Sequence, residues 1–118
     1  MKYILLIQGI IETIAGICLV IRPDILFWRS SFDSMGYNLS KMYGIIAMAF
    51  GMLCLVIYQH SESIKLQKLA ALICIGLNIF LSFHLWGLYR SDVIMDIAPC
   101  IFHIGLGAVL LIIYLRKI

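Results

Sequence analysis

Four long apolar runs limit what this chain can fold into more than any other feature. They cover residues 4–21, 42–58, 66–89 and 97–115. Each is close to the roughly 20 residues that a helix needs to cross a bilayer. None alternates apolar and polar residues as a barrel strand does, and in lipid a helix satisfies its own backbone. The sequence predicts an all-α membrane protein with four transmembrane helices in one compact bundle, a single domain over residues 1–118.

The composition supports lipid as the solvent. Hydrophobic residues make up 64% of the chain and charged residues 13%, whereas a soluble domain has about a quarter charged residues. Glu12 interrupts the first run and no small-residue cleavage site follows it, so we expect a mature helix rather than a signal peptide. The net charge of +3 is spread over loops and termini, and we expect no nucleic-acid partner.

Charge placement predicts the orientation. With an even number of spans, both termini share one side with the connection between the second and third runs. That side collects five basic residues, and the other side has four basic residues together with all the aspartates. Basic residues favour the cytoplasmic side. We therefore expect a multi-pass protein of the bacterial inner (plasma) membrane with cytoplasmic termini.

The connection over residues 22–41 is long, and apolar residues recur in it at helical spacing, namely Ile25, Trp28 and Phe32. This pattern predicts a short interfacial helix on the outer surface. The alternative is a lid over a cavity, carried by Asp24, Trp28 and Arg29. We expect Ser40 to cap the second transmembrane helix and Asp96 to cap the fourth.

Glu12 is the most costly residue in the first run. It lies eight residues after Ile4, which is about 12 Å into the membrane at the helical rise. Gly9, Thr13 and Gly16 share its face, so we expect it to point toward a close helix contact. Two interpretations remain open: a proton-linked or cation-linked site, and a carboxyl that locks two helices through a buried hydrogen bond.

Asn78 belongs to a stripe of the third run in which small and polar residues are concentrated: Ala71, Cys74, Asn78, Ser82, Leu85 and Tyr89. This face is expected to point into the bundle. Because Asn78 is near mid-depth, a hydrogen bond to Glu12 would satisfy both groups without a ligand.

His84 and His103 are expected at similar depths, about 9 Å below the outer surface. Equal depth permits a shared haem, a quinone contact or a proton relay. However, His84 lies about 120° around its helix from Asn78, and two histidines without a third ligand make a poor metal site. We therefore favour hydrogen bonding between helices, with no metal and no cofactor; a haem-binding or quinone-binding redox subunit is the alternative.

The four cysteines occur one in each run and form no Cys-x-x-Cys pair. The sequence gives no support for redox catalysis. By topology, we expect Cys18 and Cys100 toward the outer side and Cys54 and Cys74 toward the inner half, so only specific packing would permit disulfides. Their ordinary role would be as small packing groups.

Several short motifs resemble small bacterial DoxX-like membrane proteins. They are Glu12-Thr-Ile-Ala-Gly16, then Arg22-Pro23-Asp24, and Met42-Tyr43-Gly44 followed by Gly51. The likeness covers mainly the first half of the chain. It implies a compact four-helix bundle and says little about activity.

The chain is also similar to small multidrug resistance transporters in its length, its four spans and a single first-helix carboxylate, here Glu12. This likeness implies a proton and cation site at Glu12. The chain departs from that family because it lacks the glycine-rich packing motif of the third helix, and Trp86 lies near a helix end.

Together these observations predict a non-enzymatic structural, binding or partner subunit with a buried polar core of Glu12, Asn78 and His103. Beyond the lipid bilayer, its partner would be a second copy or another membrane protein. The alternatives are a proton-coupled small-molecule transporter using Glu12 and the redox subunit using His84 and His103.

Overall fold

The computed structural model describes residues 1–26 and 33–117 and contains only helices in these ranges. In chain order they are α1 (Lys2–Ile21), the short 3-10 helix η1 (Pro23–Ile25), α2 (Ser34–His60), α3 (Ile64–Arg90) and α4 (Ala98–Arg116). The predicted all-α class and the four long helices are confirmed.

All four long helices are long and apolar enough to cross a membrane. The elongated shape, 44 × 24 × 16 Å between Cα extremes, suits helices that lie along one axis. Large apolar side chains point outward, and Phe80 is 76% exposed. An outer surface of this kind is typical of contact with lipid or with another protein. The four helices therefore fit a multi-pass membrane protein.

The second helix begins eight residues before the predicted start. Asp33 caps it, because its Oδ1 atom accepts a hydrogen bond of 2.7 Å from the Gly36 amide. Ser40, the predicted cap, lies inside α2 and is buried. The apolar run marks only the part of a helix that faces lipid, and a capped helix continues beyond it through polar residues.

The predicted interfacial segment is therefore shorter than expected. Residues 34–41 belong to α2, and the described part of the connection holds η1. Trp28 and Arg29 lie outside the described residues. The end of α1 at Ile21 is as predicted, and the other boundaries differ from the prediction by one or two residues. At the start of α4, Asp96 Oδ1 accepts a hydrogen bond of 2.9 Å from the Ala98 amide.

Glycine contacts hold α1 and α2 together. A Cβ atom added to Gly16 would lie 2.6 Å from the Gly44 carbonyl oxygen, and one added to Gly51 would lie 2.8 Å from the Gly9 carbonyl oxygen. The backbones of the antiparallel helices thus touch at two levels, seven residues apart on each helix. Only glycine permits such an approach, which is the ordinary use of small residues between membrane helices.

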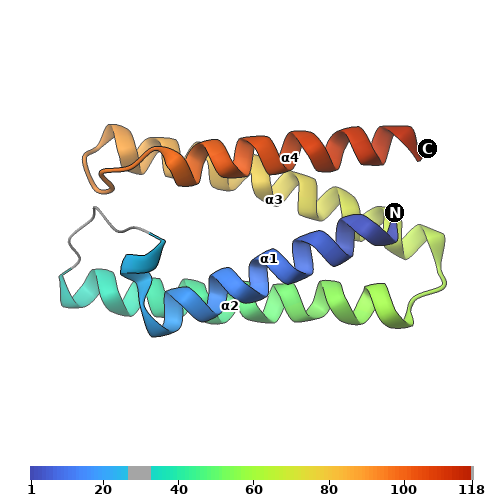
Figure 1. Cartoon of the computed structure of the whole chain (residues 1–118), viewed down its shortest axis with the longest axis horizontal. Helices are drawn as coiled ribbons and strands as arrows, with labels where there is room; N and C mark the ends of the chain where they lie inside the picture. Colours follow the sequence, from blue (N-terminus) through green and yellow to red (C-terminus); the bar gives the residue numbers. More distant parts are fainter. Residues whose placement is uncertain (27–32, 118) are drawn as a thin grey trace.

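The bundle consists of two helical hairpins, α1 with α2 and α3 with α4. Figure 1 shows one hairpin above the other, with the N- and C-termini and the α2–α3 connection at the same end. Between the hairpins, contact is made mainly by α1 on α3, with smaller contributions from α1 on α4 and from α2 on α3. The buried apolar core at this junction includes Ile4, Leu5, Ala71 and Leu110.

Candidate functional site

Gln8 and Glu12 lie one turn apart on α1 and face the second hairpin. The Gln8 Nε2 atom donates a hydrogen bond of 2.6 Å to Glu12 Oε1. Gln8 is fully buried and Glu12 nearly so. The spacing of four residues brings both side chains to one face of the helix.

Asn78 of α3 continues this contact across the junction between the hairpins. Its Nδ2 atom donates to Gln8 Oε1 at 2.8 Å and to the Cys74 carbonyl oxygen at 2.8 Å. On its other side, Asn78 Oδ1 is 2.8 Å from the Nδ1 atom of His103 on α4. Asn78 is fully buried, so all its partners are protein groups.

The four side chains form one connected series, here called the polar chain: His103, Asn78, Gln8 and Glu12. An amide oxygen only accepts, so His103 must donate its Nδ1 hydrogen to Asn78. Each amide then accepts on the His103 side and donates on the Glu12 side. The polar chain is directional, and the orientation of one amide dictates that of the other.

Ser82 and Cys100 extend polar contact between α3 and α4. Ser82 Oγ donates to the Asn78 carbonyl oxygen at 2.7 Å, and Cys100 Sγ donates to the Ser82 carbonyl oxygen at 3.3 Å. Gly107 allows α4 to approach, since a Cβ atom there would lie 3.3 Å from Asn78 Cβ. The polar chain is thus enclosed by closely packed helices.

Cys54 of α2 and Cys74 of α3 lie beside the polar chain. Their Sγ atoms are 3.7 Å apart, and both are free thiols. The described residues contain no group of three or more His, Cys, Asp or Glu side chains that could hold a metal ion.

The structure brings together three of the predicted site residues and leaves one apart. Glu12, Asn78 and His103 belong to the polar chain, but Asn78 reaches Glu12 through Gln8 rather than directly. His84 is exposed on α3 and has no hydrogen bond within the described part of the chain. His84 lies away from the polar chain because it is about 120° around α3 from Asn78.

Gln8 is the site residue that sequence analysis missed. A signal was present, because Gln8 lies four residues before Glu12 in an otherwise apolar run. Two polar side chains at this spacing share a face of the helix. A buried amide such as Gln8 needs a hydrogen-bond partner, just as a buried carboxyl does.

Asp24, predicted as part of a surface lid, pairs with Arg22 instead of any group of the bundle interior. The Arg22 Nη2 and Asp24 Oδ2 atoms are 2.6 Å apart, and both side chains are exposed. The hydrogen bond from Arg22 holds the pKa of the Asp24 carboxyl below its usual range. The other predicted lid residues, Trp28 and Arg29, lie outside the described residues.

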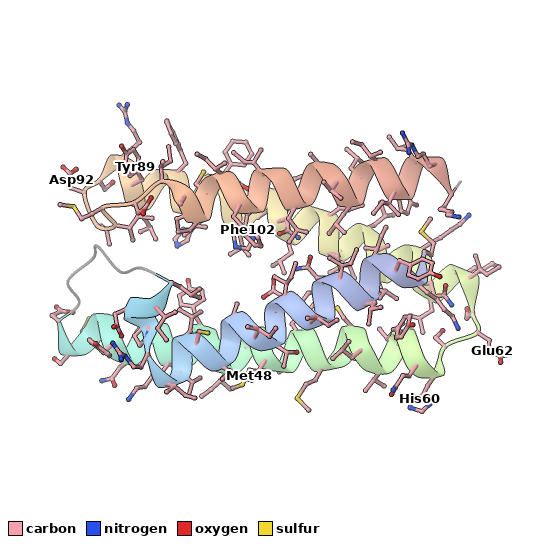
Figure 2. The ribbon with its side chains drawn as sticks, in the orientation of Figure 1. Met48, His60, Glu62, Tyr89, Asp92 and Phe102 are labelled. Carbon is pink, nitrogen blue, oxygen red and sulfur yellow. The ribbon has the colours of Figure 1, made fainter. Side chains whose placement is uncertain are left out.

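A hollow of about 470 Å³ lies at the end of the molecule that holds both termini. It is lined by Met1, Lys2, Tyr3, Glu62, Ile64, Gln67 and Lys117. In Figure 2, Glu62 lies at this end, whereas Tyr89 and Asp92 lie at the opposite end. No member of the polar chain lines the hollow, so the two are separate features.

Comparison with known proteins gives no relative. No family model, curated protein or solved structure matches the chain. The functional argument therefore rests on the polar chain and its surroundings.

Proposed function

We propose that this chain is a non-enzymatic integral membrane protein whose polar chain keeps its two hairpins in register, so that it serves as a structural or partner subunit. The observation that carries the proposal is the continuous hydrogen bonding from His103 through Asn78 and Gln8 to Glu12. Gln8, Glu12 and Asn78 are buried and His103 is partly buried, and each has a hydrogen-bond partner within the protein.

The polar chain contributes more to the choice of one helix arrangement than to the overall stability of the bundle. A hydrogen bond between membrane helices contributes on average about 0.6 kcal/mol, but an unpaired buried amide costs several times as much. A rotation of α3 that separated Asn78 from Gln8 and His103 would leave polar groups of all three residues unpaired. The polar chain therefore disfavours other helix arrangements, whereas the apolar surface would accept many of them.

The proposed setting is the bacterial inner membrane with cytoplasmic termini. It is supported by the small excess of basic residues near the termini and the α2–α3 connection, because basic residues favour the cytoplasmic side. The exposed apolar faces of the helices would contact lipid, a second copy or another membrane subunit.

Proton-coupled transport at Glu12 is the second candidate. One observation favours it: Glu12 is a carboxyl buried within an apolar helix, and an ionisable group in such a position is a common site for a proton or a cation. The polar chain itself would not conduct protons, because neutral amides do not ionise. A transport site would need access to Glu12 from outside the polar chain.

Flux measurements on the Glu12→Gln variant separate the two candidates. The substitution keeps an oxygen that can accept from Gln8 and removes the ionisable group. Wild type and variant would be reconstituted into proteoliposomes with a pH gradient and tested against a panel of lipophilic cations. The structural proposal expects the same helical content in both and no proton-coupled flux in either. Flux in the wild type that disappears in the variant would reject it in favour of transport.

A further inference from the structure

Cys54 of α2 and Cys74 of α3 are in contact where the two helices approach each other. Their Sγ atoms are 3.7 Å apart, and the side chains are 2% and 0% exposed. They come from different hairpins, at a junction where α2 and α3 otherwise have little contact. Cys100 is different, because its thiol donates to a backbone oxygen, and Cys18 is only half-buried.

The separation of the two sulfur atoms is close to that of a disulfide. A disulfide bond is about 2.05 Å long, so the sulfur atoms would approach by about 1.7 Å from their present separation. Changes of side-chain rotamer with a small adjustment of two helices provide movements of this size. The close contact across the junction was not predictable from the sequence, because each cysteine lies alone in its apolar run.

We infer that Cys54 and Cys74 are a redox-active dithiol that closes to a disulfide between the two hairpins when an organic hydroperoxide enters the membrane. The class of oxidant follows from the location. The thiols lie inside membrane-spanning helices and are almost fully buried, so an oxidant must be soluble in lipid. Organic hydroperoxides meet this condition and accept two electrons.

The reaction balances in two steps. One thiol sulfur attacks the terminal peroxide oxygen, the O–O bond breaks, and the thiol becomes a sulfenic acid while the hydroperoxide leaves as an alcohol. The second sulfur then attacks the sulfenic sulfur and displaces water, which forms the S–S bond. Two thiols are oxidised by two electrons, one hydroperoxide is reduced, and the thiol protons leave in the alcohol and the water.

A disulfide at this position would join α2 covalently to α3. The polar chain connects α1 to α3 by hydrogen bonds, and the disulfide would add a second, reversible connection between the hairpins. Because the bond would be buried between helices within the membrane, a charged water-soluble reductant would open it more slowly than a neutral one. The disulfide would therefore persist in the presence of charged, water-soluble reductants.

The test uses the full chain in phosphatidylcholine vesicles with tert-butyl hydroperoxide as the oxidant. After treatment, the protein is denatured in detergent and its free thiols are labelled with a maleimide. We expect the labelled cysteines to fall from four to two, and mass spectrometry of a digest to find a peptide pair joined through Cys54 and Cys74. The Cys100→Ser control should form the same bridge, and Cys54→Ala should not.

Other outcomes overturn the inference. If all cysteines remain labelled, the two thiols are packing groups only. Bridges between separate chains, or bridges that include Cys18, would contradict the assigned pair. The peptide map of the wild-type protein decides the question even if the Cys54→Ala variant does not fold.

Discussion

Gln8 of α1 donates to Glu12 and accepts from Asn78 of α3, and its 2.8 Å hydrogen bond to Asn78 links the two hairpins near the middle of the bundle. Both side chains are fully buried. A glutamine in the first helix thus fixes the position of an asparagine 70 residues away. The arrangement has consequences for stability, tautomer state and helix packing.

Replacement of Asn78 by leucine should destabilise the bundle. The change leaves Gln8 and His103 without their partner in an apolar interior, and an unsatisfied buried group costs about 1–3 kcal/mol. Reversible unfolding in mixed detergent micelles would measure this loss. The double variant with Gln8→Leu should be less destabilised than the sum of the single changes, because the shared hydrogen bond is removed only once. Full additivity would show that the two residues are not coupled.

Alanine at Gly16 should weaken the α1–α2 contact. Its Cβ atom would lie 2.6 Å from the Gly44 carbonyl oxygen, and such overpacking typically costs about 1–3 kcal/mol. The matched control is Gly105→Ala on α4, where a Cβ atom meets nothing within 4 Å. That change should be neutral or stabilise the helix slightly. Equal effects at both positions would contradict the close backbone contact.

His103 should carry its hydrogen on Nδ1. Asn78 Oδ1 accepts from that nitrogen at 2.8 Å, whereas an exposed histidine can exchange between tautomers. Solid-state NMR of protein labelled with nitrogen-15 at histidine would distinguish the ring nitrogens. His84 is the internal control, since it is exposed. The preference of His103 should disappear in Asn78→Leu, and an Nε2-bound hydrogen in the wild type would reverse the assigned direction of the polar chain.

The Asp24 carboxyl should titrate below the usual carboxyl range. The hydrogen bond from Arg22 lowers its pKa in the folded protein, so the pair favours folding above the ordinary carboxyl pKa. This contribution is lost as pH falls through the lowered pKa. NMR titration in micelles should show the pKa of Asp24 rising in Arg22→Gln. Because both side chains are exposed, the contribution should be small and should decrease with added salt.

The ends of α1 and α2 show which helix boundaries can be predicted from neighbouring residues. The end of α1 follows from Arg22-Pro23, because proline disfavours helical geometry in the residue before it. The predicted start of α2 was wrong by eight residues, because hydropathy marks the apolar part of a helix and not its capped end. Asp33 is a residue type that commonly caps helices, and it does cap α2, but it lies well before the apolar run from which the start was predicted.

The four long apolar helices could be derived from the sequence because run length and hydropathy are properties of neighbouring residues. The need to satisfy Glu12 and Asn78 was equally visible, since polar groups at mid-depth are costly in any arrangement. The choice of partners was different. Contact of Gln8 with Asn78, and of Cys54 with Cys74, depends on how each helix is rotated and how far it slides along its neighbour. Those two quantities are decided only when all four helices pack together, with the glycine contacts of α1 and α2 setting how closely the first hairpin closes.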